Sequence, residues 1–421
     1  MRLFTTLLAA LIPATVNAQW LENVEFGSTV DVEWTYATDE SSTQKREFVF
    51  TPDMEVELAS DGRLNVEARV IQESVGELDE EKTQFQLREF TLENMIGSTF
   101  MLFGKQQIVW GKADGLKVLD VVNPQDWREF ILDDFDDSRI PLWAVNLEKT
   151  FDDKTIQFIT ILEQQYHEYP EQGEAYAITS PLFVPEVPTG VDVHVHTRKE
   201  PKRVFKDADF GLRMTGFSSG WDYSLNYLYH YDDNAALFRQ IVITPQGPQV
   251  HIRPEHKRSH LIGGSVSNAF GDLTIRSELG VSLDKYYSTN DLNDKDGVVK
   301  TNELAYVIGL DWFGFSDTLV SFQLFQSAIQ HHEQEMLRDS VNTTATLLIE
   351  KDYLNDTLKS RILWLHGSND NDGLVRPKLS YQVDDMVEVW LGADIFYGDQ
   401  DGIYGQFKEN DRVFIGTELA I

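Results

Sequence analysis

The sequence lacks cysteine altogether, which excludes a disulfide framework and acylation at a lipoprotein cysteine. It also lacks, after residue 18, any apolar run that approaches the roughly 20 residues of a membrane-spanning helix. Basic residues are scarce beside acidic ones, with 36 Lys and Arg against 69 Asp and Glu and a formal net charge of -33. Such a chain repels phosphate, so we expect no nucleic-acid partner. Composition leaves two classes of protein, a large secreted β protein and an outer-membrane barrel.

Residues 1–18 have the pattern of a secretory signal peptide. Arg2 provides the positive charge, residues 3–16 form the short apolar region, and Ala18 ends a cleavage site of small residues. A short membrane anchor is the alternative, but the apolar run is too short to cross a bilayer. We therefore expect a mature chain of residues 19–421 that is exported from the cytoplasm.

Much of the remaining chain alternates apolar and polar residues with a period of two, as strands with one apolar face do. The clearest segments are residues 63–69, 221–231, 272–284 and 387–397. A length of about 10 to 12 residues is what a tilted strand needs to cross the hydrocarbon layer. Aromatic residues stand near segment ends, where a membrane interface favours them, at Trp221, Tyr231, Trp312 and Tyr397.

The connections between these segments alternate between short and long. Tight turns fall at sites such as residues 152–153, 270–271 and 355–356, and longer polar connections such as residues 233–257 and 398–410 lie between turns of this kind. This order predicts about 18 strands, between roughly 16 and 20, with both termini on the short-turn side. A soluble sandwich has no reason to keep that order. The fold we expect is all-β, a closed antiparallel transmembrane β-barrel.

If the apolar face of each strand meets lipid, the opposite face lines the interior, and that face carries charges of both signs. Charges are costly inside hydrocarbon, so their regular place on one face indicates a wet or paired surface. The candidate lumen-lining residues are Arg63, Arg69, Arg213, Arg276, Glu278, Arg376, Lys378, Glu388, Asp394, Arg412 and Glu418. They could form cross-strand ion pairs that stiffen the wall, or a permeation path of mixed polarity.

Residues 111–141 interrupt the alternation and belong to the long-loop side. Asn123 is a suitable helix N-cap and Pro124 suits a first helical turn, so we expect a short amphipathic helix to begin there. The candidate constriction residues in and beside this segment are Trp110, Asn123, Pro124, Asp126, Trp127, Phe130, Asp133, Asp134, Arg139 and Pro141. We expect the loop to fold inward and constrict the lumen rather than to stand outside as a lid. It could gate the lumen or simply plug it.

Three motifs in and beside this loop resemble those of a known family. They are Gly104-Lys-Gln-Gln-Ile-Val-Trp-Gly111, Val122-Asn-Pro-Gln-Asp126 and Ile140-Pro-Leu-Trp143. In this order they are similar to motifs of proteobacterial outer-membrane proteins catalogued as domain of unknown function 1302. The resemblance implies a porin-like barrel in the outer membrane of a Gram-negative bacterium. It also implies trafficking of hydrophobic or lipid-like molecules, with an inner-membrane exporter and a periplasmic lipid carrier as partners.

No spacing of Ser, His and Asp marks a catalytic site, so we expect neither enzyme activity nor a cofactor. His194 and His196, within a long extracellular loop of residues 165–205, could bind a metal as alternate strand residues, but we favour an exposed pair without metal. Acidic loop tips at residues 290–297 and 369–373 could hold a divalent cation or bridge to lipopolysaccharide, and solvated turns are the simpler interpretation.

The function we expect is a channel that moves a hydrophobic or amphipathic substrate with an envelope transport system, in contact with outer-membrane lipid. One alternative is a general porin for small polar solutes. The other is a barrel that transports nothing and binds ligands through residues 165–205.

Overall fold

The computed structural model describes residues 23–38, 45–58, 62–75, 80–113, 116–185, 190–201, 203–245 and 247–421. The predicted signal peptide falls on residues 1–18, which lie outside the described residues.

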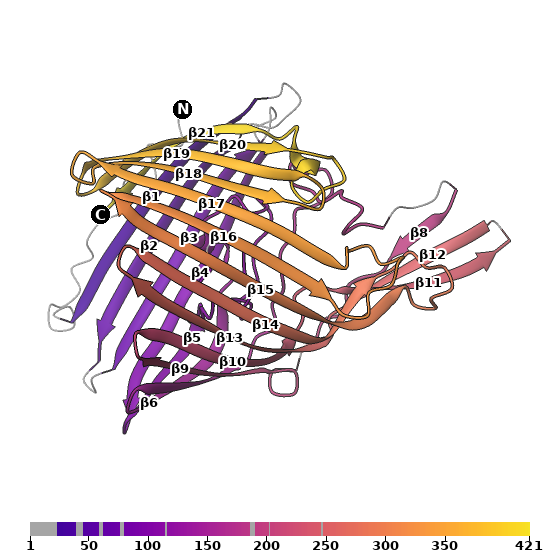
Figure 1. The fold of residues 1–421 in the computed structure, drawn as a ribbon, viewed down its shortest axis with the longest axis horizontal. Helices are drawn as coiled ribbons and strands as arrows, with labels where there is room; N and C mark the ends of the chain where they lie inside the picture. The colour runs from indigo at the N-terminus through magenta and orange to yellow at the C-terminus, as the bar shows by residue number, and fades with distance from the viewer. Residues whose placement is uncertain are drawn as a thin grey trace.

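Eighteen antiparallel strands form one closed barrel (Figure 1). They are β1 (Val24–Ala37), β2 (Lys45–Glu57), β3 (Arg63–Val75), β4 (Glu80–Ile96), β5 (Thr99–Gln106), β6 (Leu142–Phe151), β7 (Lys154–Ile161), β9 (Asp209–Ser218), β10 (Trp221–Tyr231), β13 (Arg258–Phe270), β14 (Leu273–Ser288), β15 (Val298–Phe315), β16 (Thr318–Ile329), β17 (Val341–Tyr353), β18 (Leu358–Gly367), β19 (Asp372–Asp384), β20 (Val387–Tyr397) and β21 (Arg412–Ala420). Each strand pairs with the next barrel strand, and β1 closes the ring on β21 from Thr29↔Ala420 to Ala37↔Arg412. The predicted barrel and its strand count are confirmed.

The two rims of the barrel differ in their connections. One rim carries tight turns, and it is also where β1 begins and β21 ends, with a hydrogen bond of 3.0 Å from Ser28 N to Ile421 O. The other rim carries the long connections, residues 107–141, 162–208 and 232–257. Not every connection on this second rim is long, because residues 368–371 alone join β18 to β19.

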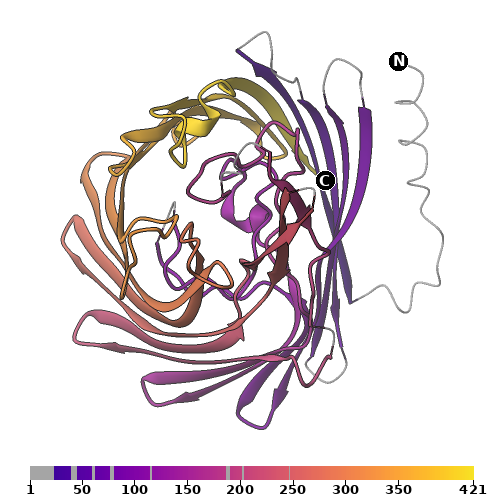
Figure 2. The ribbon, with the colours of Figure 1, turned by 90° about the vertical axis from the view of Figure 1, so that its right-hand side faces the viewer.

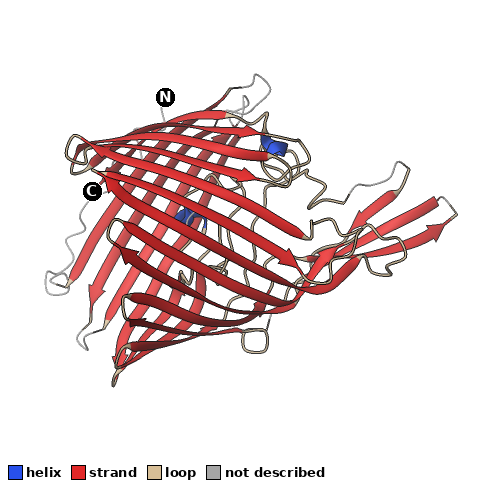
Figure 3. Ribbon diagram, viewed as in Figure 1, coloured by secondary structure: helices blue, strands red, loops and turns tan. Residues whose placement is uncertain are grey.

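Two of the long connections build a small sheet of their own. β11 (Ala236–Thr244) and β12 (Gly247–Glu255) form an antiparallel hairpin, and β8 (Asp192–Val195) pairs with β12 in parallel. Figure 3 shows this sheet extending beyond the rim, away from the barrel wall. The rim with long connections therefore carries a projecting, strand-built surface.

Side chains alternate between the two faces of the wall as the sequence period predicts. In β10, Leu225 and Tyr227 are exposed on the outside, whereas the intervening Asn226 and the following Leu228 are buried. The same holds in β13, where Leu261 is buried and Ile262 is exposed. Aliphatic and aromatic side chains recur on the outside, which gives an outer surface suited to hydrocarbon.

Residues 107–141 connect β5 to β6 and run inside the ring of strands (Figure 2). The predicted helix beginning at Asn123 and Pro124 is wrong, because Asn123 lies in a bend and Gln125 forms an isolated β-bridge with Arg139. Among the described residues of the connection, the helical part is α1 (Phe135–Ser138), about one turn long. In the described portion of the chain, no helix has both the length and the apolar character needed to cross a membrane.

Candidate functional site

The segment inside the barrel, residues 107–141, is called the lumen loop below. Its first half packs against the wall. Trp110 is fully buried, and its Nε1 donates a hydrogen bond of 2.8 Å to Oε1 of Gln157 on β7. The apolar cluster around it joins loop residues to six barrel strands and contains Ile108, Trp110, Val118, Leu119, Val122, Leu142, Ala144, Ile159, Ile161, Leu228, Leu261, Val307 and Phe325. This half of the loop is part of the protein core.

One wall carboxylate binds the backbone of the loop. Glu278, in β14 and only 2% exposed, accepts hydrogen bonds from the backbone N–H groups of Lys112, Ala113 and Leu119. The Ala113 bond measures 3.0 Å and the Leu119 bond 3.2 Å. A carboxylate that accepts several backbone donors is a strong, directional anchor. Glu278 therefore fixes the entry of the loop into the lumen.

Arginines of the wall donate hydrogen bonds to backbone carbonyls of the same loop. Arg213 binds the carbonyl of Val109 at 3.0 Å, and Arg276 binds that of Lys112 at 2.5 Å. Further along, Arg88 on β4 binds the carbonyl of Arg139 at 2.9 Å. On the far side of the lumen, Arg376 binds the carbonyl of Leu132 at 2.6 Å. Together these four arginines bind six backbone carbonyls along the loop, those of Val109, Lys112, Ile131, Leu132, Asp136 and Arg139.

The loop is also braced internally. Oδ1 of Asn123 accepts the backbone N–H of Ile108 at 2.7 Å, and its Nδ2 donates to the carbonyl of Ile140 at 2.8 Å. Two nitrogens of Arg139 reach Oδ2 of Asp120 at 3.0 and 2.8 Å. The side chains of Asn123, Asp120 and Arg139 are buried. Their hydrogen bonds connect the start of the loop to its end, which makes the loop a compact unit.

The middle of the loop crosses to the opposite wall. The ring of Phe130 lies 4.8 Å from the ring of Phe407 and 5.9 Å from that of Tyr404. Phe407 and Tyr404 belong to the connection between β20 and β21. The ring of Trp127 meets His167 edge to face at 5.9 Å. Burial lowers the pKa of His167 to about 3, so this imidazole is neutral and accepts the backbone N–H of Gln125 at 2.8 Å. The loop is thus held at both sides of the lumen.

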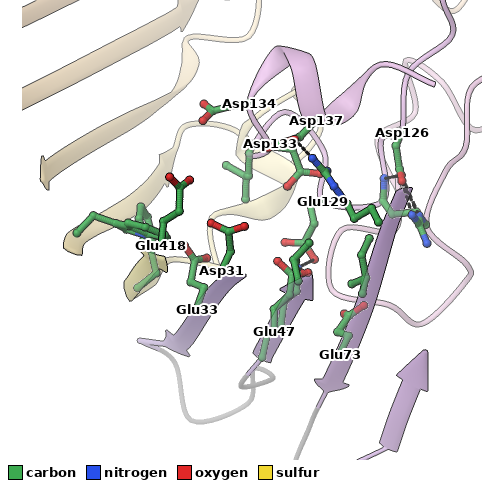
Figure 4. A pocket seen from close by; sticks show the side chains of 18 of the residues that line it. Asp31, Glu33, Glu47, Glu73, Asp126, Glu129, Asp133, Asp134, Asp137 and Glu418 are labelled. Atoms are coloured by element: carbon green, nitrogen blue, oxygen red, sulfur yellow. Dashed lines mark hydrogen bonds and ion pairs between the residues drawn. The ribbon is translucent and has the colours of Figure 1, made fainter. Parts of the chain in front are cut away.

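Between the loop and strands β1–β4 and β18–β21 lies a cavity of about 1030 Å³. Its charged lining is dominated by carboxylates, several of which Figure 4 shows pointing into the same space. The acidic residues are Asp31, Glu33, Glu47, Asp53, Glu67, Glu73, Asp126, Glu129, Asp133, Asp134, Asp137, Glu174, Glu388 and Glu418. The basic residues are Lys45, Arg69, Lys82, Arg128, Arg361, Arg376, Lys378 and Arg412.

Strand register places six of these carboxylates in two rows across the wall. In the first row, Glu388 pairs with Glu418 across β20 and β21, and Glu418 pairs with Asp31 on β1. In the second row, Glu33 on β1 pairs with Glu47 on β2, and Glu47 pairs with Glu73 on β3. Like charges directly opposite one another destabilise a sheet. We call these the two acidic rows.

The loop adds its own charges on the facing side of the cavity. Glu129 lies 3.1 Å from Lys45 and 2.7 Å from Arg412. Although burial opposes its charge, these two cations lower the pKa of Glu129 to about 2. Desolvation and the neighbouring Glu129 raise the pKa of Asp133 to about 7. The loop therefore presents one firmly ionised carboxylate and one that titrates near neutral pH.

The residues predicted from sequence take several different places in the structure. The structure brings nine of them to the cavity: Arg69, Asp126, Asp133, Asp134, Arg376, Lys378, Glu388, Arg412 and Glu418. Others anchor or brace the loop, or belong to apolar clusters in which loop residues pack: Trp110, Asn123, Pro124, Trp127, Phe130, Arg139, Arg213, Arg276 and Glu278. Pro141 is buried at the end of the loop, directly before β6. Asp394 is fully buried and binds Arg376 and Arg412, each at 2.7 Å. Arg63 lies apart, 3.0 Å from Glu55.

The lining carboxylates missed by the sequence reasoning include four members of the acidic rows: Asp31, Glu33, Glu47 and Glu73. A signal for two of them was present, because Asp31 and Glu33 alternate with Val30 and Val32 and so share the polar face of one strand. What the sequence did not show is that Glu47 and Glu73 would stand beside Glu33, since that depends on the register of two hairpins.

Carboxylates of the two acidic loop tips bind backbone N–H groups, within the turn in the first tip and in the connection between β20 and β21 in the second. In the first, Oδ1 of Asp294 accepts the backbone N–H of Asp296 at 3.0 Å and of Gly297 at 2.6 Å. In the second, Oδ2 of Asp372 accepts the backbone N–H of Tyr404 at 2.6 Å. The solvated turns that we favoured at these tips, and the divalent cation given as the alternative, both stay predictions.

The molecule is an 18-stranded barrel with a fixed segment crossing its lumen, the architecture of porin-like barrels. The family model described as "Protein of unknown function (DUF1302)" matches residues 99–415, and the chain belongs to this family. No curated protein sequence matches the chain.

Several solved structures share the fold. OccK5 (OpdH) of Pseudomonas aeruginosa is 9% identical, with a TM-score of 0.52 over 96% of this chain and 99% of that chain. OccK2 (OpdF) of the same organism, solved in complex with glucuronate, is 8% identical, with a TM-score of 0.54 over 96% and 99% of the two chains. OpdK of the same organism, solved with vanillate, is 9% identical, with a TM-score of 0.53 over the same shares. At these identities the likeness is one of fold.

Proposed function

We propose that this protein is an outer-membrane channel whose permeation path runs through the cavity beside the lumen loop and favours cations. The apolar outer face and charged inner face of a closed barrel support a place in the outer membrane. The observation that carries the proposed selectivity is the pair of acidic rows that face the cavity.

The repulsion within the two acidic rows destabilises the barrel unless a cation lies near their carboxylates. Directly opposed side chains in a sheet stand roughly 5 Å apart, and two like charges at that distance repel by about 1 to 3 kcal/mol at effective dielectric constants of about 80 down to 20. A mobile cation in the cavity relieves that repulsion, whereas an anion adds to it. Rings and rows of carboxylates are a known means of cation selection in pores. Lys45, 3.1 Å from Glu47, offsets only part of the charge of the second row.

The lining also bears on the kind of solute. Apolar side chains of Leu132, Leu363, Trp390 and Phe414 share the cavity with the carboxylates. A cavity of this size is comparable to the sites that hold drug-sized molecules. Together these features favour an amphipathic solute that carries a positive charge over a wholly apolar lipid. The inner-membrane exporter and periplasmic lipid carrier implied by the family resemblance stay predictions.

The test is the reversal potential of the refolded protein in planar bilayers across a KCl gradient. We expect K⁺ to be favoured over Cl⁻, and we expect the triple substitution Glu33→Gln, Glu47→Gln and Glu73→Gln to reduce that preference. A matched control removes the same three charges from the tight-turn rim, through Asp153→Asn, Asp356→Asn and Asp385→Asn. Selectivity that is absent, or that both triple variants change equally, would refute the proposed role of the acidic rows.

The same recordings separate the alternatives. A large conductance without charge preference would favour a general porin for small polar solutes. No conductance, with the lumen loop present or deleted, would leave a barrel that acts through its outer surface.

A further inference from the structure

The projecting sheet carries three histidines on one face. His194 lies in β8, His196 follows that strand directly, and His251 lies in β12. The parallel register places His251 opposite His194, and the backbone N–H of His196 donates to the carbonyl of Ile252 at 2.8 Å. Because side chains alternate along a strand, all three imidazoles point to the same side of the sheet.

The rings are already in contact. Nε2 of His196 and Nδ1 of His251 lie 3.1 Å apart. The rings of His194 and His251 stack with centroids 5.1 Å apart, and Nε2 of His194 lies 3.0 Å from Oδ2 of Asp192. The side chains of His194 and Asp192 are 48% and 60% exposed, so an ion can reach them from solvent.

We propose that His194, His196 and His251 bind a divalent transition-metal ion such as Zn²⁺ or Cu²⁺ on the projecting sheet. Imidazole nitrogens suit these ions. Two nitrogens bound to one tetrahedral zinc ion at about 2.0 to 2.1 Å stand roughly 3.3 Å apart, close to the spacing of the His196 and His251 nitrogens. The hydrogen that now joins these nitrogens moves, through solvent, to the other nitrogen of its own ring, so both nitrogens present lone pairs to the metal.

His194 supplies the third ligand after a rotation of its ring. In the described part of the chain, no three His, Asp or Glu side chains already converge as a metal cage, and His194 currently stacks on His251 instead of facing the shared point. Its contact with Asp192 matches the carboxylate partner that metal-bound histidines commonly have, which orients the ring and raises its basicity. Asp192 is therefore a positioning residue in this proposal, and the metal would use Nδ1 of His194.

Isothermal titration of Zn²⁺ into the refolded full-length barrel tests the site. We expect one equivalent to bind, and we expect His196→Ala or His251→Ala to abolish that binding. Asp192→Asn should weaken it by about tenfold. The control is His331→Ala with His332→Ala, an adjacent pair on another loop, which should leave the binding unchanged.

Cu²⁺ provides a second measurement that does not depend on affinity. Electron paramagnetic resonance of the one-equivalent Cu²⁺ complex should show hyperfine coupling to three nitrogens, reduced to two in His194→Ala. Zinc binding that is absent, or that persists in His196→Ala and His251→Ala, would overturn the proposal. So would a copper spectrum with no histidine nitrogen coupling. All of these residues lie outside the barrel, and unchanged heat-modifiability on gels shows that each variant has folded.

Discussion

Replacing Glu278 by alanine should release the lumen loop while the barrel stays closed. The side chain is buried and accepts three backbone N–H groups, from Lys112, Ala113 and Leu119. A hydrogen bond to a charged acceptor contributes about 1.5 to 3 kcal/mol, and a buried donor left without an acceptor carries a penalty of similar size. Because the three bonds share one carboxylate, we expect about 3 to 6 kcal/mol in total rather than a full sum.

A loss of that size changes the behaviour of the loop. Each 1.4 kcal/mol is about a tenfold change in an equilibrium constant, so even the lower figure raises the undocked fraction by about a hundredfold. Single-channel recordings of Glu278→Ala should show a larger conductance with more transitions than the intact protein. Glu278→Gln should fall between the two, because its amide oxygen still accepts an N–H whereas its amide nitrogen opposes the N–H of Leu119.

The control for this experiment is Glu350→Ala. Glu350 lies in β17 and pairs with Lys359 on the neighbouring strand, 3.6 Å away. Its loss should leave conductance and gating unchanged. If Glu278→Ala conducts as the intact protein does, and its loop resists protease equally well, the reasoning from backbone anchoring is refuted.

Three further predictions concern the same loop. Deleting residues 111–141 should give a large and steady conductance, and a conductance that stays small would show that another segment blocks the lumen. Trp110→Ala should lower the free energy of unfolding by about 3 to 5 kcal/mol, because the indole is fully buried in the cluster between loop and wall. The loss is measured as a lower urea midpoint. Trp312 is exposed, so Trp312→Ala should lower the free energy of unfolding far less. Since the pKa of Asp133 is about 7, its carboxyl is neutral below that pH and charged above it, so the preference for K⁺ should rise between about pH 6 and 8. Asp133→Asn should reduce that rise. An unchanged pH profile in this variant would show that other groups cause the rise.

The barrel was predictable from the sequence because each strand carries its own signal. Alternation in β10 and β14 is local, and an even strand count follows from turns that the chain shows directly. The helix expected at Asn123 failed for the opposite reason. The side-chain oxygen that would cap a helix is bound instead by the N–H of Ile108, and the amide nitrogen binds the carbonyl of Ile140. Partners fifteen and seventeen residues away override a local capping signal.

What each charged side chain does in the lumen was harder to predict than which side chains face the lumen. Strand parity places Arg213, Arg276 and Arg376 inside the barrel, but only the path of the loop decides that their donors bind its carbonyls. The three histidines of the proposed metal site could likewise not be grouped from the sequence alone. His194 and His196 were visible as alternate residues, whereas His251 joins them through a parallel pairing of strands that lie in different connections.

Anchoring of the loop and selection of the solute use different charges, which makes the two separable by mutation. The anchoring groups, Glu278 and Arg276 among them, lie where the loop meets the wall and bind its backbone. The acidic rows lie on strands β20, β21 and β1–β3, across the cavity from the loop. Neutralising Glu33, Glu47 and Glu73 should therefore change ion preference without releasing the loop, while Glu278→Ala should release the loop and leave the rows intact. A barrel in which either change produced both effects would have one coupled site, and the division of labour inferred from these contacts would be wrong.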